Sequence, residues 1–590
     1  MPVQSFDQWD EPAAKLPVRA RTALARVFVF ALTVLLSGYA AWEMHQVIGQ
    51  GSGTTLQYVL LVFFSLTFVW IAFAAANALL GFAIDTTKPG ASPRNCQLAT
   101  RTAVVMPIFN EDTPRVFCSL ASMAEDLVRS GQASHFDLFV LSDTTEPKIA
   151  EQEEQAIRAL QEKFRDRLSI YYRRRDRNEG RKAGNIADFV QRWGGANDFM
   201  IVLDADSYMS AAAMIRLALA MQEHPEAGLI QTAPQLFNGK TLFARLQEFA
   251  TAVYGPVLSR GLALWYGTEG NYWGHNGIIR IRAFAASCGL PNLSGRKPFG
   301  GEIMSHDFVE AALLRRAGFA IHMWPHIEGS YEETPPTLTD HIARDRRWAQ
   351  GNLQHSKIVP AAGLHWVSRF HLVNGIMSYL ASPLWLLFLA TGVVLSWEAE
   401  MFPPDYFPSA FALFPTWPRF DAERALALLE FSLAVLLLPK LFGLLNGLIE
   451  QKIRSRAGGA LALINSVILE TLFSALIAPI LMLTQTRFVI DILRGRDSGW
   501  SAQKRDGERV PLRELTRQYA SHTIAGLVLC VGTLMISPQV WLWLSPVWLG
   551  LILAIPVAHL MSHRLASETA FRVKVLSTSV PSGTTESRDI

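Results

Sequence analysis

The chain has 590 residues, of which 50% are hydrophobic and 11% aromatic, and its formal net charge at pH 7 is +3. This length exceeds what one hydrophobic core organises and predicts two or more domains. The small, dispersed charge gives no indication of a nucleic-acid partner. The four cysteines have neither metal-ligand spacing nor the pattern of a disulfide framework. The large apolar fraction instead indicates membrane spans.

The N-terminal part is predicted to enter the membrane twice. Residues 1–20 are polar, lack a signal-peptide pattern and are expected to be cytoplasmic. Within residues 21–84, the apolar runs Val27–Trp42 and Tyr58–Ile84 can each cross a hydrocarbon core of ~30 Å. Basic residues precede the first run, and the positive-inside rule places them in the cytoplasm. These residues are Arg19, Arg21 and Arg26.

Residues 85–365 have a different pattern. Short apolar strands alternate with amphipathic helices, which predicts a cytoplasmic α/β domain with a mostly parallel sheet. The region is long enough for one globular catalytic domain. The sequence therefore predicts a soluble domain inserted between membrane helices.

Apolar runs return after this domain. Two spans are expected in residues 371–449, with Pro383 kinking the first, and two more in residues 518–561, the last at Val540–Leu560. Residues 562–590 are expected to be a cytoplasmic tail, partly disordered.

The run between these pairs, within residues 459–506, is ambiguous. If residues 460–483 simply crossed, the cations from Arg487 to Arg505 would lie outside, against the positive-inside rule. We therefore expect this run to re-enter as a hairpin or to lie in the interface. A plain span followed by an atypical external loop is the alternative.

Two aspartates follow a buried strand in the α/β domain. The apolar residues 199–203 lead directly into Asp204 and Asp206, at the end of the strand where open α/β sheets bind ligands. Alternate residues of an extended chain point to the same side, so both carboxylates can hold one divalent cation on a diphosphate. An acidic turn that merely closes the strand is the alternative.

Other polar residues stand at comparable strand ends. Glu111 and Asp143 each follow a predicted strand, where they can bind a ribose or a base. Lys182 lies in the glycine-rich stretch Gly180–Asn185 at a helix start, which favours anions. A helix N-cap and a basic turn are the structural alternatives for these positions.

Three later motifs could bind an acceptor sugar or assist the departure of the leaving group. The loop Gly270–Gly277 combines aromatic, glycine and amide residues, which suit either sugar stacking or ordinary packing. Asp307 starts an amphipathic helix, as a general base or only as a cap. Arg347 could neutralise a leaving diphosphate and Trp348 could stack on a sugar, unless the two form an interfacial basic and aromatic belt.

Together these motifs resemble the D, DxD, D, (Q/R)xxRW set of the processive, membrane-integrated family 2 glycosyltransferases. The residues that carry the likeness are Glu111, Asp143, Lys182, Asp204, Asp206, Asp307, Arg344, Arg347 and Trp348. Within that group the local sequences are similar to the glucans biosynthesis glucosyltransferase H family. The stretches concerned are Gly180–Asn185, Glu269–Asn276, Phe299–Asp307, Tyr331–Pro336 and Arg346–Gln354.

The resemblance implies an α/β GT-A-like (Rossmann-like) domain that builds the β-1,2-linked backbone of osmoregulated periplasmic glucans from UDP-glucose. It implies a bacterial inner-membrane location, with the catalytic domain and both termini cytoplasmic. Partners implied are the growing glucan chain, the lipid bilayer, acyl carrier protein and a periplasmic glucan-processing protein. Export coupled to synthesis is a further expectation.

The resemblance also implies roles for single residues. Asp206 with Asp204 would hold Mg²⁺ or Mn²⁺, and Asp307 would be the base. The nucleotide-binding residues would be Glu111, Asp143, Lys182, Asp204, Arg344 and Arg347. The acceptor-side residues would be Trp273, His275, Asn276, His306 and Trp348.

Two positions depart from the cellulose synthase pattern. Ser305-His306 replaces the usual Thr-Glu before the third aspartate, and Arg344 replaces the usual Gln, so the linkage does not carry over from cellulose. The stretch Thr484–Trp500 occupies the position of a gating segment, with Trp500 expected near the nucleotide. Alternative functions are a cellulose-like synthase, a polyprenyl-phosphate glycosyltransferase, a non-catalytic UDP-glucose sensor and a secondary transporter.

Overall fold

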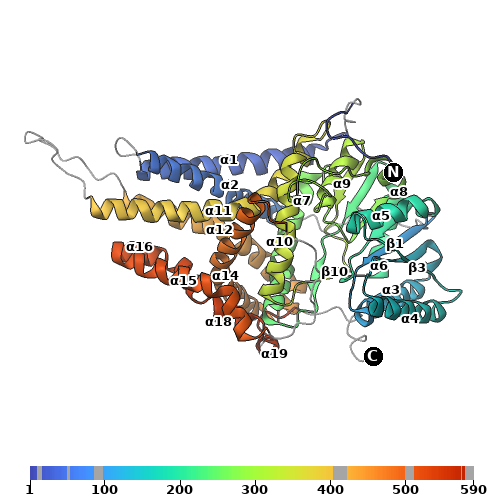
Figure 1. Ribbon diagram of the computed structural model, residues 1–590. Helices are drawn as coiled ribbons and strands as arrows, with labels where there is room; N and C mark the ends of the chain where they lie inside the picture. Colours follow the sequence, from blue (N-terminus) through green and yellow to red (C-terminus); the bar gives the residue numbers. More distant parts are fainter. Residues whose placement is uncertain are drawn as a thin grey trace, which may run out of the picture.

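The computed structural model describes residues 1–9, 16–48, 54–84, 97–402, 421–497, 510–572 and 574–578. Figure 1 shows a domain of strands and helices at one end and long helices that extend away from it. The predicted α/β domain between membrane-type helices is confirmed. Trp500 and the end of the C-terminal tail lie outside the described residues.

The central sheet has seven strands in the order β3-β2-β1-β4-β8-β6-β9. Only β8 runs antiparallel to its neighbours. The strands are β1 Thr102–Ile108, β2 Phe136–Ser142, β3 Ser169–Arg174, β4 Phe199–Val202, β6 Ala227–Gln231, β8 Gly277–Arg280 and β9 Ala320–Met323. A second sheet joins β5 Ser207–Met209, β10 Ser330–Glu333 and β7 Gln235–Phe237 in that order.

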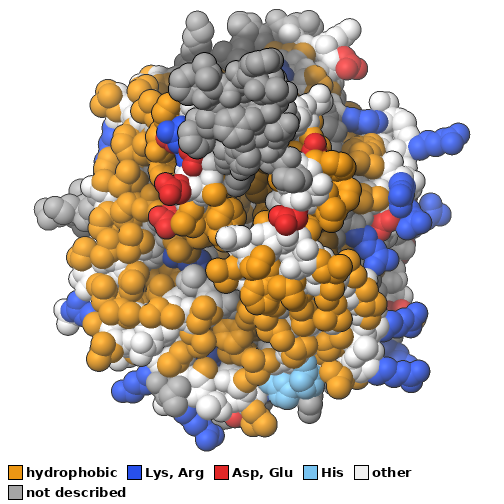
Figure 2. Space-filling view, turned by 90° about the vertical axis from the view of Figure 1, so that its left-hand side faces the viewer, with side chains coloured by type: hydrophobic (Ala, Val, Ile, Leu, Met, Phe, Trp, Pro, Cys, Tyr) orange, Lys and Arg blue, Asp and Glu red, His pale blue; other side chains and the backbone are white. Residues whose placement is uncertain are grey.

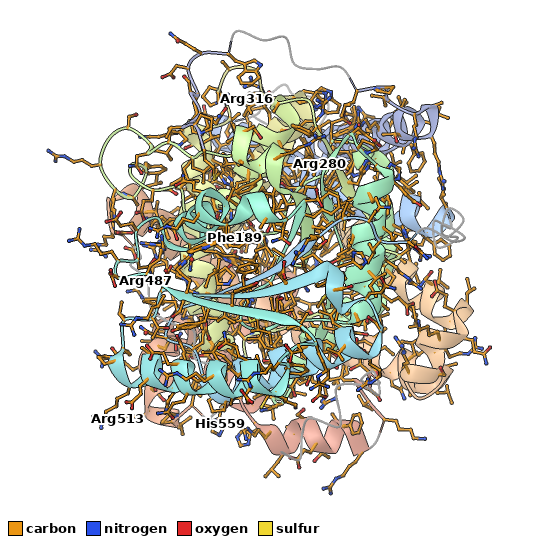
Figure 3. The ribbon with its side chains drawn as sticks, turned by 90° about the vertical axis from the view of Figure 1, so that its right-hand side faces the viewer. Phe189, Arg280, Arg316, Arg487, Arg513 and His559 are labelled. Atoms are coloured by element: carbon orange, nitrogen blue, oxygen red, sulfur yellow. The ribbon has the colours of Figure 1, made fainter. Side chains whose placement is uncertain are left out.

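Helices cover both faces of the large sheet, and β1 shows why its sequence is apolar throughout. Val104 and Met106 pack with α3 Thr113–Arg129, α4 Pro147–Lys163 and α6 Ala211–Glu223 on one face. Ala103 and Val105 pack with α5 Arg181–Arg192, α8 Ile281–Ser287 and α9 His306–Arg316 on the other. Phe189 of α5, labelled in Figure 3, meets Phe139 of β2 with ring centroids 4.8 Å apart. A strand buried on both sides needs no polar alternation.

Two helices join the sheet domain to the long helices. Helix α7 (Leu242–Tyr266) packs against α2 (Thr55–Ala83) and α12 (Ala422–Ile449). Helix α10 (Leu338–Gln354) packs against α11 (Trp366–Met401) and α14 (Ala460–Leu493). One apolar cluster runs from Leu246 of α7 through Leu353 of α10 to Val489 and Tyr519 in the long helices. The two parts therefore share a continuous core.

Among the described residues, six helices are long and apolar enough to cross a membrane. They are α1 Ala20–Ile48, α2 Thr55–Ala83, α11 Trp366–Met401, α12 Ala422–Ile449, α14 Ala460–Leu493 and α15 Leu512–Ile536. Hydrophobic side chains cover much of the face that their far ends present in Figure 2. Shorter helices are α13 Gln451–Arg456, α19 Arg564–Arg572, η1 Ala133–His135, η2 Gly194–Ala196 and η3 His355–Lys357.

One expectation about these helices is wrong, and one expected span is broken rather than continuous. Residues 460–493 form one continuous helix through Pro479, so a hairpin within this run is wrong. The expected last span, Val540–Leu560, is three short helices that return alongside α15. These are α16 Pro538–Trp543, α17 Ser545–Ile552 and α18 Ala554–Met561. Pro546 and Pro556 lack the backbone N–H that a continuous helix would use.

Both ends of the described chain lie against the sheet domain. The Gln4 N–H donates to the Gly289 carbonyl at 2.8 Å, and the ring of Trp9 lies 4.3 Å from the Arg316 guanidinium. Arg316 lies near the top of Figure 3. At the other end, Thr578 donates a hydrogen bond to Glu248 of α7. The first part of the predicted tail is ordered as helix α19.

Candidate active site

The carboxyl ends of three adjacent parallel strands bring three predicted residues to one edge of the sheet. Glu111 follows β1, Asp143 follows β2 and Asp204 follows β4, and these strands pair with one another. The Asp204 N–H donates to Ser207 Oγ at 3.0 Å and the Ser207 N–H donates to the Asp204 carbonyl at 2.9 Å. This tight turn places Asp206 beside the second sheet.

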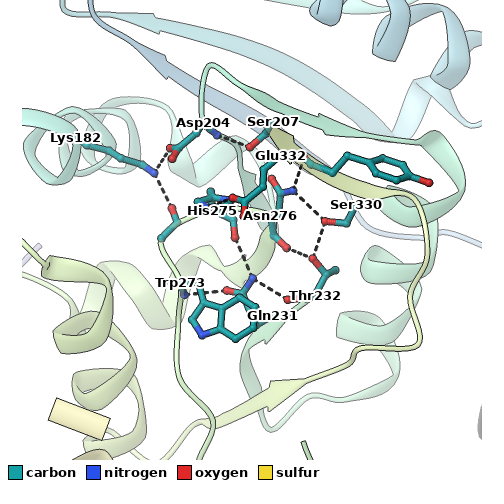
Figure 4. Close-up of polar contacts among 12 residues, drawn as sticks. Lys182, Asp204, Ser207, Gln231, Thr232, Trp273, His275, Asn276, Ser330 and Glu332 are labelled. Carbon is teal, nitrogen blue, oxygen red and sulfur yellow. Dashed lines mark hydrogen bonds and ion pairs between the residues drawn. The ribbon is translucent and has the colours of Figure 1, made fainter. Parts of the chain in front are cut away.

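Lys182 links the aspartate turn to the acceptor-side loop. Its Nζ forms an ion pair with Asp204 and donates to the Gly274 carbonyl at 2.7 Å, as Figure 4 shows. Gly180 caps α5 with a φ of 68°, and its N–H donates to Glu302 Oε1 at 3.1 Å. The glycine thus permits the turn that aims Lys182 at the sheet edge.

Asp143 has a partner that the sequence reasoning missed. Arg175 donates two hydrogen bonds to its carboxylate, each 2.6 Å long, and a third to the Glu179 carbonyl at 2.9 Å. Asp143 is only 4% exposed, so this pair orders the loop before Lys182. The run of arginines that ends β3 was the available signal.

Asn110 shapes the loop that carries Glu111. Its backbone φ is 51°, and its Oδ1 accepts from the N–H groups of Thr145 and Glu146, each at 3.1 Å. The amide therefore ties the loop after β1 to the start of α4. Glu111 is partly exposed beside it.

Asp307 lies at the start of α9 and faces Gly274. A Cβ on Gly274 would be 3.2 Å from Asp307 Oδ2, so the missing side chain allows the close approach. Burial raises the pKa of the Asp307 carboxyl, the neighbouring imidazolium of His306 opposes the shift, and the Glu310 carboxylate adds to it. His306 Nδ1 lies 3.0 Å from Glu310 Oε1.

The loop around His275 forms a second polar group. Although burial opposes protonation, the carboxylates of Glu332 and Asp204 raise the pKa of His275 to about 9. Its Nε2 lies 2.9 Å from Glu332 Oε2. The Trp273 backbone N–H donates to Gln231 Oε1 at 3.0 Å, which fixes the loop that carries the partly exposed indole.

The expectation that Asn276 contacts an acceptor is wrong. Its side chain is fully buried, and its Nδ2 donates to Ser330 Oγ and to the Tyr331 carbonyl, each at 3.0 Å. Its carbonyl accepts from Thr232 Oγ1 at 2.6 Å (Figure 4). Asn276 instead holds the loop to β6 and β10.

Helix α10 carries the remaining predicted residues. The Arg344 guanidinium lies 4.2 Å from the Trp348 ring centroid, and the Trp348 side chain is 48% exposed. Burial lowers the pKa of Arg344, while the carboxylates of Glu332 and Asp206 oppose the shift. Arg347, one turn from Arg344, lies on the same helix. The helix thus runs from the aspartate turn to an exposed indole.

Comparison with known proteins identifies this arrangement. The sequence pattern of glycosyl transferase family 2 matches residues 103–287, and that of glycosyl transferase family group 2 matches residues 199–439. Curated relatives named glucans biosynthesis glucosyltransferase H occur in Rhodopseudomonas palustris, Shewanella oneidensis and Vibrio cholerae. Each is 48% identical, over 95%, 95% and 90% of this chain and 78%, 77% and 74% of the relative.

The chain belongs to the glucans biosynthesis glucosyltransferase H family. It is a family 2 glycosyltransferase with a GT-A-like domain. A solved mannosyltransferase from Pyrobaculum calidifontis, described in complex with GDP-Man and Mn²⁺, aligns with 66% of this chain and 99% of its own. That alignment has a TM-score of 0.42 and 12% identity.

The aspartate pair of this glycosyltransferase fits a hard divalent cation that also binds substrate. Within the described residues no group of three or more His, Cys, Asp or Glu side chains forms a ready-made metal site. Mg²⁺ commonly takes only one or two carboxylates and completes its shell with substrate phosphates and water. Asp204 is paired with Lys182, and Asp206 follows it in the same turn.

Proposed function

We propose that this glycosyltransferase transfers glucose from UDP-glucose to a growing β-1,2-linked glucan, the backbone of an osmoregulated periplasmic glucan. The relatives' printed name supports a glucan product. The main support for this reaction is that one loop contacts both Lys182, on the proposed donor side, and Asp307, on the proposed acceptor side. The Gly274 carbonyl accepts a hydrogen bond from Lys182, and the missing side chain leaves room for the Asp307 carboxylate.

In this proposal the donor binds along the strand ends. Glu111 and Asp143 face the nucleoside, and Lys182 lies beside the diphosphate and Asp204. Asp206, supported by Asp204, would hold Mg²⁺ or Mn²⁺, which neutralises charge on the diphosphate when bound. Arg344 and Arg347 add positive charge on the side of the departing UDP.

The acceptor enters from the side of α9 and α10. Trp348 stacks on the terminal sugar, with Trp273, His275 and His306 lining the approach. The acceptor hydroxyl oxygen forms a bond to C1 as the bond from C1 to the diphosphate oxygen breaks, which inverts C1. The hydroxyl proton passes to Asp307, whose raised pKa suits a base.

We propose further that the sheet domain and both termini are cytoplasmic. The first and last described residues bind the sheet domain, which favours one side for all three. Helix α14 contacts that domain at two points 15 residues apart: Glu470 accepts from Tyr254 at 2.7 Å, and Gln485 donates to Asp345 at 2.9 Å. We infer that α14 lies along the interface rather than crossing, so the five other long helices and the broken return α16–α18 make six crossings, an even number.

A polar stripe supports coupled export through an inner membrane. Asn374, Ser378 and Ser382 are spaced by one helical turn on α11, beginning beside α10. Gly375 abuts Asn352, whose Nδ2 donates to the Trp348 carbonyl at 2.9 Å. Polar residues within spans commonly mark pathways. Acyl carrier protein and a periplasmic glucan-processing protein are proposed partners on family grounds alone.

The deciding test is product analysis. The purified full chain in lipid nanodiscs is incubated with labelled UDP-glucose and Mg²⁺, and the product is examined by methylation analysis. The proposal expects polymeric 1,2-linked glucose that disappears on chelation with EDTA. A 1,4-linked polymer would indicate a cellulose-like synthase, and a lipid-linked monosaccharide would indicate a polyprenyl-phosphate glycosyltransferase.

A further inference from the structure

A buried charge cluster joins the first long helix to the base of the active-site loop. Glu269 accepts from Arg26 of α1 on one carboxylate oxygen and from Arg315 of α9 on the other, at 3.1 Å for the Arg315 Nη2. The side chains of Glu269 and Arg315 are 1% and 3% exposed, and that of Arg26 is 11% exposed. Such a group is costly to bury unless every member is paired.

Arg26 also binds the backbone that precedes this loop. Its Nε donates to the Trp265 carbonyl and its Nη2 to the Tyr266 carbonyl, each at 2.8 Å. These are the last carbonyls of α7, which a helix leaves without internal partners. The adjoining Gly267 has a φ of 61°, and a Cβ there would be 2.6 Å from Thr22 of α1. Helix α1 is therefore seated directly on the end of α7.

The loop leads from this cluster to the proposed reacting groups. Gly270 is fixed by its N–H to the Ile321 carbonyl at 2.8 Å, and four residues later Gly274 meets both Lys182 and Asp307. Arg315 lies near the end of the helix that Asp307 begins. Glu269 thus links the loop that carries Gly274 to helix α9, which carries Asp307.

We propose that Arg26 is a positioning residue, through which membrane helix α1 sets the loop 269–276 against α9 and so places Asp307 for proton removal. This rests on the function proposed above. Although burial opposes ionisation, the two guanidinium groups lower the pKa of Glu269, so the cluster is charged. Arg26 touches neither donor nor acceptor in this assignment and acts only through the loop.

The test compares Arg26→Met and Arg26→Lys with Arg21→Met, all in the full chain in nanodiscs. Arg21 is exposed on the same helix and is the matched control. Loss of the fork should increase amide hydrogen exchange in residues 269–276 and lower kcat roughly 10- to 100-fold, with an unchanged KM for UDP-glucose. Lysine should be intermediate, because an ammonium cannot bind three acceptors in a fixed fork.

Unchanged exchange in residues 269–276 of Arg26→Met, or an Arg21→Met variant that behaves like it, would overturn the proposal. If Arg26→Met is not recovered folded, the Arg26→Lys variant decides: hydrogen exchange and kcat equal to those of the wild type would overturn the proposal. The exchange measurement involves no donor. Failure of the wild-type chain to polymerise UDP-glucose would therefore overturn the proposed function and leave the positioning role to be judged by exchange.

Discussion

Substitution of Asp307 gives the most direct test of the proposed chemistry. The Asp307 carboxylate is packed against Gly274 and its pKa is raised, which suits a group that must accept a proton. We expect Asp307→Asn to lower the rate of polymerisation by roughly 10²–10⁴-fold, because the amide cannot act as a base. UDP binding, measured by calorimetry, should be retained. Wild-type polymerisation by this variant would exclude Asp307 as the base.

The pH dependence should respond to His306. The imidazolium of His306 lowers the pKa of Asp307, and it also neutralises Glu310, which raises that pKa. In His306→Gln both changes raise the pKa of Asp307, so the rate should require a higher pH. The acidic limb of the profile of kcat against pH should therefore shift to higher pH. His135→Gln is the control: His135 lies at the opposite end of β2, and its replacement should not shift the limb. A downward shift would contradict the assignment.

Gly274 offers a purely steric test of the same contact. Its φ is 89°, and an added Cβ would lie 3.2 Å from Asp307 Oδ2, so Gly274→Ala should strain the backbone and displace the carboxylate. Gly131→Ala is the matched control, since Gly131 has a φ of 72° and open space around it. Both variants should lose roughly 1–2 kcal/mol of stability. Only Gly274→Ala should lose most turnover in the UDP-glucose assay.

The side chains that sequence reasoning misassigned share one cause. Asn276 lies in a loop rich in possible sugar contacts, but which side of a loop faces the solvent depends on packing that the sequence pattern does not contain. Its amide is used by β10, 54 residues away at Ser330. Arg175 was missed because its partner Asp143 lies 32 residues earlier. Strand-end acids such as Asp204 were found because local sequence alone places them.

At the scale of elements, the buried strands were predictable and the long helices only partly so. Strand β4 is apolar because both faces are covered, and its short length excludes a span. The positive-inside rule showed that residues 460–483 should not simply cross the membrane. The rule constrains only the number of crossings, so it does not distinguish a hairpin from one helix that lies in the interface. The breaks in the last span coincide with Pro546 and Pro556, which a count of apolar residues does not register.

The interfacial position proposed for α14 predicts how its flanks can be labelled. Ser455 and Arg494 are exposed on either side of this helix, and Glu400 is exposed at the end of α11. Single cysteines at these positions, in a chain whose four native cysteines are replaced by serine, are treated with an impermeant maleimide. We expect labelling at 455 and 494 in inverted vesicles only, and at 400 in right-side-out vesicles only. Labelling of 455 and 494 from opposite sides would show that α14 crosses.

For the molecule as a whole, the polar stripe on α11 predicts vectorial synthesis. Inverted vesicles, in which a cytoplasmic sheet domain as proposed would face outward, are supplied with labelled UDP-glucose and then treated with an added glucanase. We expect glucan that resists digestion until detergent is added, because the chain passes into the lumen. The Asp307→Asn variant should give none. Glucan that is wholly digested without detergent would contradict coupled export.

The docking of the first nine residues on the sheet domain has a consequence for the order of synthesis. Gln4 and Phe6 bind backbone groups of Gly289 and Ala362, which are translated some 280–360 residues later. At about 5–20 residues per second, the complete docking surface follows the N-terminus by roughly 20–70 s. The N-terminus therefore remains without its final partners while α1 and α2 enter the bilayer. It docks only after the sheet domain has been synthesised, so its docking is a late step of assembly.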